Sequence, residues 1–191
     1  MNTREIPGLD QQSRVKRFEE IFVTHLDAAY DLARWLTRDE RNAEDVVQEA
    51  CLRAFKFFDS FHGGNGRAWL LAIVRNTYYS WIEKNQGQLL NVSIDDDTFG
   101  ANGSDIAALE HDVNDGVDRL MQQEEARRQV NRALEQLPAE FREVIVLREL
   151  EEMSYKEIAT VAGIPLGTVM SRLARARRLL QEYLRQGTQE P

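Results

Sequence analysis

One stretch restricts the fold of this chain more than any other: residues 154–169, SYKEIATVAGIPLGTV. Its residues indicate both where a helix begins and where a tight turn follows. Ser154 followed by Glu157 forms a capping box, which predicts the first turn of a helix. Gly163 permits the left-handed backbone that a tight turn between two helices requires. The stretch therefore predicts a helix-turn-helix over residues 155–174.

The second helix of this motif has a predicted buried face and a predicted outer face, and Pro165 sets its entry. Helical spacing places four residues inward: Val169, Leu173, Ala176 and Leu180. It turns five residues outward, on a face short enough for a major groove: Met170, Ser171, Ala174, Arg175 and Arg178. The Thr168 hydroxyl can reach a phosphate near the start of this helix. The alternative is an ordinary helical hairpin whose arginines are solvated.

The net charge of -8 is unfavourable for DNA binding if the chain is taken as a whole. The charge is, however, distributed unevenly along the chain. Residues 91–125 contain ten acidic side chains and a single basic one, Arg119. Residues 165–185 contain one glutamate and five arginines: Arg172, Arg175, Arg177, Arg178 and Arg185. This second segment provides a local positive surface for phosphate.

Residues 17–86 are predicted to form a helical unit, because apolar residues recur three and four positions apart without strand-like alternation. Three helices are expected. The first ends near Thr37, the second opens at Asn42 as N-cap, and the third covers residues 67–84. The glycine-rich residues 62–66 form a loop before the third helix.

Residues 87–116 are predicted to be a flexible acidic linker, since they contain too few large apolar side chains to offset the entropy of ordering. A second helical unit covers residues 117–186, and its first helix breaks at Leu137-Pro138. Its other helices are expected at residues 139–152, 155–162 and 166–184. The fold class is therefore all-α, with two small helical domains joined by a linker. A chain of 191 residues can form two small cores.

Several functional classes are disfavoured by the composition. The single cysteine, Cys51, excludes an internal disulfide, and three scattered histidines imply no metal site. No cofactor is implied, and no phosphate loop or nucleophile motif indicates an enzyme. The chain has no signal peptide and no apolar run long enough to span a bilayer, which predicts a cytoplasmic protein without membrane insertion.

The helix predicted after Asn42 has two different faces. Five residues can face inward: Val46, Val47, Ala50, Ala54 and Phe57. The opposite side carries an acidic, hydrogen-bonding stripe with one leucine: Asp45, Gln48, Glu49 and Leu52. Such a stripe suits docking on a partner helix.

Residues 67–81 combine aromatic and basic side chains in one predicted helix. Aromatic rings can stack on unpaired bases while cations hold the backbone. Core packing is as good an interpretation as base stacking for three of these residues: Trp69, Ile73 and Trp81. The better surface candidates are Arg75, Asn76 and Tyr79.

Three segments together resemble the sigma-70 family of RNA polymerase sigma factors, in its extracytoplasmic-function group. They are AEDVVQE at residues 43–49, RAWL at 67–70 with RN at 75–76, and the stretch from LP at 137–138 to GTVMSRL at 167–173. They occur in the order typical of the family and cover most of residues 17–184.

The resemblance implies a promoter-recognition subunit that binds core polymerase at the clamp helices of its largest subunit and at the flap. The polymerase-binding residues would be Asp45, Gln48, Glu49 and Leu52. The region 2-like domain, residues 17–86, would open the minus-ten element by capturing a flipped base. Its DNA contacts would be His62, Asn65, Arg67, Trp69, Arg75, Asn76 and Tyr79. The region 4-like domain, residues 117–186, would read the minus-thirty-five element with Thr168, Met170, Ser171, Arg172, Ala174, Arg175 and Arg178.

The resemblance also implies a stress or envelope regulon under the control of an anti-sigma factor, which could hold the chain at the membrane. The acidic linker would thread positively lined polymerase channels, and the alternative is a solvated tether. Met170 and Ala174 depart from the larger or basic residues that relatives often have there, which leaves the upstream base preference open. Too few residues follow Gly187 for the accessory domain of some relatives.

Two other functions remain as alternatives. A stand-alone helix-turn-helix regulator would bind a palindrome as a dimer without polymerase, whereas a sigma factor needs core enzyme. An enzyme or a pure interaction adaptor is the alternative from a different class. An enzyme would need converging catalytic residues, and an adaptor would show no dependence on DNA.

Overall fold

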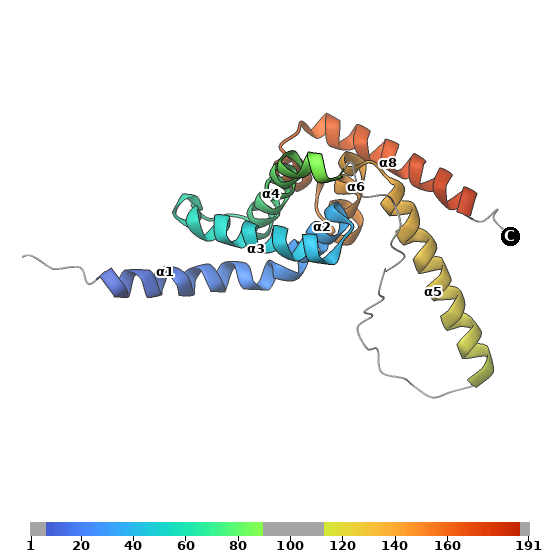
Figure 1. Ribbon diagram of the computed structural model, residues 1–191, viewed down its shortest axis with the longest axis horizontal. Helices are drawn as coiled ribbons and strands as arrows, with labels where there is room; N and C mark the ends of the chain where they lie inside the picture. Colours follow the sequence, from blue (N-terminus) through green and yellow to red (C-terminus); the bar gives the residue numbers. More distant parts are fainter. Residues whose placement is uncertain (1–6, 90–112, 188–191) are drawn as a thin grey trace, which may run out of the picture.

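The computed structural model describes residues 7–89 and 113–187, and every regular element within these two ranges is a helix (Figure 1). We refer to these ranges as the first and the second unit. The prediction of an all-α fold with two helical domains is confirmed. Most of the predicted linker, residues 87–116, lies outside the described residues, and helix covers both of its ends.

The first unit has four helices where three were predicted. They are α1 (Pro7–Phe22), α2 (Leu26–Thr37), α3 (Glu40–Lys56) and α4 (Gly66–Leu89). The predicted first helix is divided by a 3-10 turn over Val23–His25. His25 has φ -114° and ψ 6°, outside the helical region, so the α-helical hydrogen bonding is interrupted there. The predicted end of that helix at Thr37 is confirmed.

The second unit has four helices and one π-helical turn. They are α5 (Val113–Gln136), α6 (Ala139–Ile145), the π turn η3 (Val146–Leu150), α7 (Tyr155–Ala162) and α8 (Leu166–Gly187). The predicted break at Leu137-Pro138 and the predicted bounds of α7 are confirmed. A single helix over 139–152 is wrong, because Glu151 N–H bonds the Val146 carbonyl five residues back, at 3.1 Å. A π turn keeps a helix-like composition, so the spacing of apolar residues does not reveal it.

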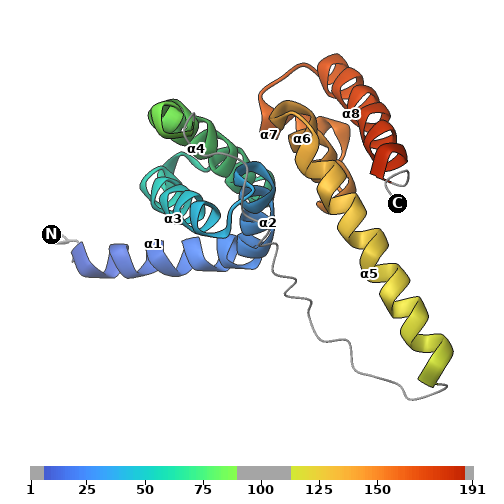
Figure 2. The same ribbon diagram turned by 45° about the vertical axis from the view of Figure 1, so that its right-hand side comes forward.

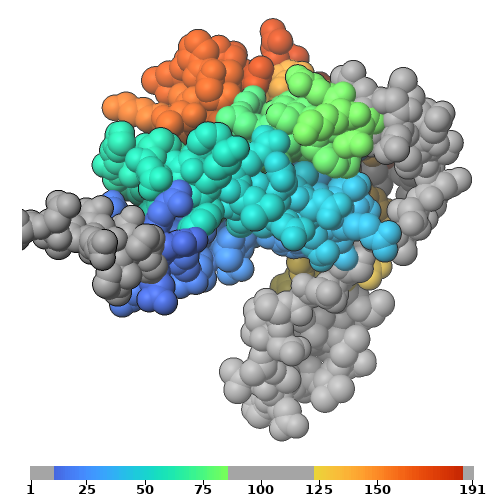
Figure 3. All heavy atoms as spheres, turned by 60° about the vertical axis from the view of Figure 1, so that its left-hand side comes forward, coloured from blue at the N-terminus to red at the C-terminus, as the bar shows by residue number. Residues whose placement is uncertain are grey.

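The two units pack against each other, with α4 against α7 and α2 against α6 (Figure 2). The space-filling view shows the orange carboxy-terminal segment seated directly on the teal and green of the first unit (Figure 3). Helix α4 therefore has one side in the core of its own unit and another side covered by the second unit.

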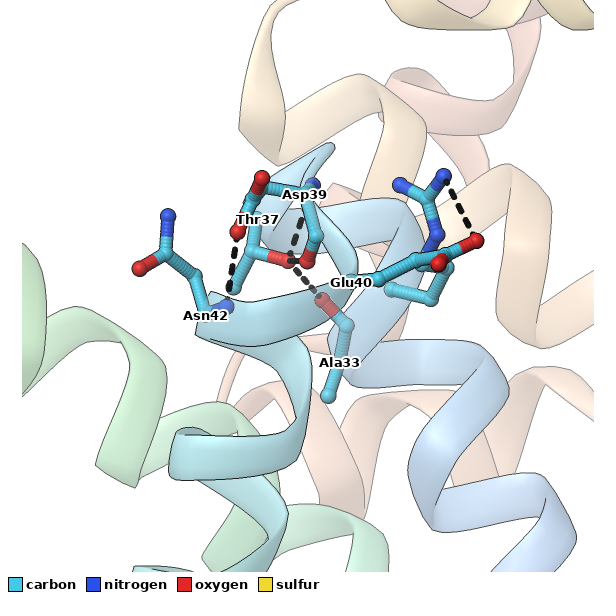
Figure 4. Close-up of polar contacts among 6 residues, drawn as sticks. Ala33, Thr37, Asp39, Glu40 and Asn42 are labelled. Carbon is cyan, nitrogen blue, oxygen red and sulfur yellow. Dashed lines mark hydrogen bonds and ion pairs between the residues drawn. The ribbon is translucent and has the colours of Figure 1, made fainter. Parts of the chain in front are cut away.

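The turn between α2 and α3 is fixed by Asp39 (Figure 4). Arg38 is left-handed, with φ 61°, and ends α2. The Asp39 carboxylate then accepts a hydrogen bond from Asn42 N–H at 2.7 Å, and the Thr37 hydroxyl donates to the Ala33 carbonyl at 2.9 Å. The predicted N-cap at Asn42 is wrong, because Asn42 lies inside the helix and its N–H is the group that is capped.

The core of the first unit combines aliphatic side chains with an aromatic cluster. Its fully buried members include Phe22, Leu32, Leu36, Val46, Leu70, Leu71 and Val74. The Phe22 ring centroid lies 5.1 Å from that of Trp69 and 5.4 Å from that of Phe61. A Cβ on Gly66 would lie 2.8 Å from Ile21 Cγ2, so only glycine lets the start of α4 approach α1 this closely. The cluster fixes the start of α4, where predicted DNA contacts begin.

Candidate polymerase and nucleic-acid interfaces

The acidic stripe predicted on α3 is exposed. Its four residues, Asp45, Gln48, Glu49 and Leu52, all face solvent, and Leu52 is 63% exposed. Glu49 accepts a hydrogen bond from Arg53 one turn later, at 2.8 Å. On the opposite side Val46, Ala50 and Ala54 are buried, as predicted. The helix therefore presents carboxylates and one large apolar side chain outward from a rigid, packed backbone.

Phe57 differs from its predicted inward position, since its side chain is 54% exposed. Helix α3 ends at Lys56, and Phe57 is its C-cap with φ -96° and ψ 11°. Helical spacing therefore no longer applies at Phe57, and Phe58 in the following 3-10 turn takes the buried position instead. Phe57 is a second exposed apolar side chain, directly after the end of α3.

The glycine loop before α4 is shaped by two left-handed glycines and closed by Asn65. Gly63 and Gly64 have φ values of 95° and 97°. Residues with a side chain rarely adopt such positive φ values. The Asn65 side-chain oxygen accepts a hydrogen bond from Ala68 N–H at 3.0 Å, so it caps α4. Its side-chain amide donates to Glu157 of the second unit at 2.6 Å. His62 is exposed.

Three of the basic and aromatic side chains of α4 are bonded to the second unit. Arg67 is bonded to Glu151, and Arg75 is bonded to Glu143. The Tyr79 hydroxyl donates to the other oxygen of Glu143 at 3.0 Å. The prediction of Arg75 and Tyr79 as surface residues is therefore wrong in this arrangement, because the second unit covers them.

Two other predicted residues of α4 have different surroundings. Asn76 is exposed, and its oxygen accepts a hydrogen bond from Arg75 at 3.3 Å. Trp69 is half-buried against the aromatic core. Ile73 and Trp81 are likewise half-buried and packed on the core. Core packing is therefore shown for Trp69, Ile73 and Trp81, and their role as a stacking platform stays a prediction.

Glu143 is the electrostatic centre of the contact between the units. Its side chain is fully buried, and burial raises the pKa of its carboxyl group, while Arg75 opposes that shift. Burial together with the Glu143 charge raises the pKa of the Tyr79 hydroxyl. The Arg75 guanidinium also lies 4.6 Å from the centroid of the Tyr79 ring, a cation–π geometry. These three groups form one cluster across the two units.

The helix-turn-helix has the local geometry that the sequence predicts. Glu157 N–H donates to the Ser154 hydroxyl at 3.3 Å, and Ser154 N–H donates to the Glu157 carboxylate at 2.8 Å. The capping box is confirmed, and these bonds lower the pKa of Glu157. Gly163 is left-handed, with φ 64° and ψ 34°, which confirms the turn.

The outer face of α8 is also as predicted. Met170, Ser171, Ala174, Arg175 and Arg178 are exposed, while Thr168 and Arg172 are half-buried. Val169, Leu173 and Ala176 are buried, and Leu180 packs on the core at its edge. Arg177, on the same helix, bonds Glu149 at 2.7 Å. Helix α8 therefore leaves Arg175 and Arg178 exposed on its outer side.

Two further observations concern the described ranges, 7–89 and 113–187. No three His, Cys, Asp or Glu side chains in them converge as a metal ion would require. None of their helices combines the length and the apolar character needed to cross a membrane.

Comparison with known proteins assigns both units to one family. Residues 21–88 match the family Sigma-70 region 2, and residues 127–180 match Sigma-70, region 4. The ECF RNA polymerase sigma-E factor of Escherichia coli K12 is 39% identical over 137 residues, which cover 71% of this chain and 70% of that protein. The chain belongs to the extracytoplasmic-function group of the sigma-70 family. The ECF RNA polymerase sigma factor SigE of Mycolicibacterium smegmatis is 30% identical over 181 residues, 94% of this sigma factor and 66% of the relative.

Two solved structures resemble this sigma factor over both units. The sigma factor RpoE in complex with the anti-sigma factor NepR, from Bartonella quintana, matches with a TM-score of 0.65 and 30% identity over 89% of this chain and 98% of that chain. CnrH in complex with the cytosolic domain of CnrY matches with a TM-score of 0.59 and 27% identity. The match covers 89% of this chain and 88% of CnrH. Region 2 corresponds to α2–α4, and region 4 corresponds to the end of α5 through α8.

Sequence reasoning missed the glutamates of region 4 that meet region 2. Arg142 and Glu143 stand together within the otherwise apolar run FREVIVL, where a charged residue can be buried only if it is paired. This adjacent pair of charges is the signal that could have indicated a partner for Glu143. Glu151 has no such signal, because it lies between the exposed residues Leu150 and Glu152.

Proposed function

We propose that this sigma factor binds core RNA polymerase through the acidic stripe of α3 and directs promoter-specific initiation through two DNA faces. The observation that carries the proposal is the exposed set Asp45, Gln48, Glu49 and Leu52 on region 2 of a chain that also holds region 4. Sigma factors are initiation factors without catalytic activity of their own. The domain roles follow as proposals: residues 17–86 for polymerase and the minus-ten element, 87–116 as a tether, and 117–186 for the minus-thirty-five element.

The stripe is suited to a helical partner on polymerase. Two carboxylates and an amide supply hydrogen-bond acceptors and donors, and Leu52 supplies apolar area at their edge. The partner proposed from the family is the pair of clamp helices in the largest subunit, with the flap contacting region 4. Each contact alone is modest, and linkage through the tether makes the second one intramolecular.

Charge reversal tests this contact. The double variant Asp45→Lys, Glu49→Lys should no longer co-purify with core polymerase, because two attractive contacts become repulsive. The matched control is Glu19→Lys, Glu20→Lys, which reverses two exposed carboxylates on α1. Both variants should keep the far-UV circular dichroism of the parent. Retention of polymerase binding by the α3 variant would refute the proposed docking surface.

The upstream DNA face is proposed on α8, with Thr168, Met170, Ser171, Arg172, Ala174, Arg175 and Arg178 as contacts. Arg175→Ala should weaken binding to the upstream element by about 1–3 kcal/mol if it makes a bidentate base contact. Arg177→Ala is the matched control, since Arg177 is occupied by Glu149. An equal loss on every DNA sequence would indicate a phosphate contact instead. Full affinity of Arg175→Ala on the upstream element would exclude Arg175 from this face.

The minus-ten face is proposed on the loop and α4, with His62, Asn65, Arg67, Trp69, Arg75, Asn76 and Tyr79 as contacts. Stacking on an aromatic ring and hydrogen bonds in a pocket would hold a flipped base, so no nucleotide hydrolysis is needed. Trp69 is half-buried, so part of its side chain packs on the core and part stays exposed.

An anti-sigma factor is proposed as a regulatory partner, because one of the similar solved structures is a sigma factor in complex with an anti-sigma factor. It would cover the polymerase-binding surface and hold the sigma factor inactive until a signal releases it. A stand-alone helix-turn-helix regulator is not favoured, since region 2 and its acidic stripe have no role in that function.

A further inference from the structure

Phe57 is the only aromatic side chain among the large apolar residues that are exposed in the described ranges, and it is 54% exposed. The rings that follow it, Phe58 and Phe61, are buried in the core. A single exposed apolar side chain is common on protein surfaces. What distinguishes Phe57 is its surroundings, where the backbone is fixed and the neighbouring cations are exposed.

The backbone of Phe57 is held at both of its polar groups. Its N–H donates to the Arg53 carbonyl at 2.9 Å. Its carbonyl accepts a hydrogen bond from Ser60 N–H at 2.9 Å and another from the Ser60 hydroxyl at 2.6 Å. A partner that contacts the ring therefore meets a side chain on an ordered backbone, so binding has little further conformational entropy to remove.

Helix α1 is attached to the same turn. The Arg14 guanidinium donates to the Asp59 carboxylate at 3.1 Å and to the Phe55 carbonyl at 2.9 Å. It also lies 4.8 Å from the centroid of the Phe55 ring, a cation–π geometry. Figures 1 and 2 show α1 next to α3. The match to Sigma-70 region 2 begins at residue 21, so it assigns no role to most of α1.

Two cations lie beside the rings at this end of α3. The Lys56 ammonium is 5.7 Å from the centroid of the Phe57 ring, and the Arg17 guanidinium is 5.7 Å from that of the Phe58 ring. Both cationic side chains are exposed. Neither forms an ion pair with a carboxylate of the described residues. Two positive charges next to the exposed ring are therefore available to an anionic partner.

The charge of α3 changes sign where the acidic stripe ends. Asp45 and Glu49 carry the charge of the stripe, and Lys56 follows Leu52 by four residues, so helical spacing places Lys56 on the same side. A cationic partner that fits the carboxylates would be repelled at Lys56 and Arg17. A partner that complements this end combines negative charge with a flat apolar surface for the ring. Single-stranded nucleic acid has both, in its phosphates and its bases.

The position of Phe57 relates it to the proposed minus-ten face. His62, which opens the glycine loop, follows five residues later, and five residues span at most roughly 18 Å, the length of about five stacked nucleotides. We propose that Phe57 is a stacking platform for single-stranded promoter DNA near the loop, with Lys56 and Arg17 beside the phosphates. The inference rests on the proposed minus-ten face and adds three residues to it.

The test separates the aromatic ring from its apolar area. Phe57→Leu keeps an apolar side chain without a ring, and Phe57→Tyr keeps the ring. The matched control is Val23→Ala, because Val23 is exposed to a similar extent, 53%. Holoenzyme formed from core polymerase and the full chain is titrated with a fluorescent fork-junction promoter fragment, whose non-template strand is single-stranded through and beyond the minus-ten element. The promoter is one whose start site has been mapped with the same holoenzyme.

Phe57→Leu should weaken binding of the fragment about fivefold or more, the lower end of what stacking of one base on an aromatic ring contributes. Phe57→Tyr and Val23→Ala should bind as tightly as the parent. Fragments with one abasic site each then locate the stacked base. At one position within about five nucleotides of the base held at the loop, Phe57→Leu and the parent should bind the abasic fragment equally, because the partner of the ring is gone.

The two cations are tested by the salt dependence of binding. The double variant Arg17→Gln, Lys56→Gln should reduce the slope of log affinity against log salt by about 0.7 for each phosphate contact that is lost. Arg41→Gln is the matched control, since it removes an exposed cation at the other end of α3. An unchanged slope in the double variant would overturn the assignment of Arg17 and Lys56 to the phosphates.

Equal binding of the fragment by Phe57→Leu and the parent would overturn the platform. So would an equal loss in Phe57→Leu and Phe57→Tyr, or a loss that persists on every abasic fragment, since contact of Phe57 with polymerase would produce it. Co-purification with core checks polymerase binding, and far-UV circular dichroism checks folding. The proposed minus-ten face is tested separately by His62→Ala and Asn76→Ala on the same fragment. Full binding by both would refute that face, whereas losses there with full binding by Phe57→Leu would refute the platform alone.

Discussion

The helix-turn-helix contains two glycines that should respond to the same substitution with opposite signs. Gly163 is left-handed, with φ 64°, and Gly167 lies within α8. A Cβ added at either position would meet no atom within 4 Å. Steric contact therefore contributes nothing at either site, and only the backbone conformation distinguishes them.

The magnitudes follow from that difference. An alanine in the left-handed region costs about 1–2 kcal/mol, so Gly163→Ala should lower the free energy of unfolding by about 1 kcal/mol once the smaller entropy of the unfolded alanine chain is included. Gly167→Ala should raise it by about 0.4–1 kcal/mol. Gly163→Asn should be close to neutral, because asparagine tolerates the left-handed region.

Urea titration of the full chain measures these changes. With a urea m-value of about 2 kcal/mol/M, a change of 1 kcal/mol moves the midpoint by about 0.5 M. Far-UV circular dichroism follows all helices, whereas tryptophan fluorescence follows the first unit, which contains Trp35, Trp69 and Trp81. Midpoints that shift in the same direction for Gly163→Ala and Gly167→Ala would refute the assignment of the turn to Gly163.

Three other changes have expected outcomes. Asp39→Ala should lower the free energy of unfolding by about 1 kcal/mol because it removes the N-cap of α3, while Asn42→Ala should change it by less than half as much; a larger loss for Asn42→Ala in urea titrations would restore Asn42 as the cap. Phe22→Ala should cost about 3–5 kcal/mol, since Phe22 is 1% exposed among packed rings, while Phe57→Ala should stay within about 0.5 kcal/mol; equal midpoints by tryptophan fluorescence would contradict this. Burial raises the pKa of the Cys51 thiol, so less thiolate is present at a given pH and the pH profile of its reaction with a thiol reagent should lie higher in the folded than in the urea-unfolded chain; coincident profiles would show that Cys51 is not protected.

The sequence by itself determined the features that depend only on residues close to one another along the chain. The capping box, the turn at Gly163 and the buried and exposed sides of α8 all follow from helical spacing and local backbone preference. The exposed stripe at Asp45 to Leu52 follows in the same way. Local errors occurred where two caps competed, at Asp39 and Asn42, and where helical spacing stopped, at Phe57.

Only the tertiary structure decided which polar residues of α4 face solvent. Spacing along one helix placed Arg75 and Tyr79 on its predicted surface side. It contains no information about Glu143, which is 68 residues away from Arg75 and covers that side. A contact between two separately folded helical units depends on complementary charge and shape at long range, and neither is encoded in a local pattern of residues.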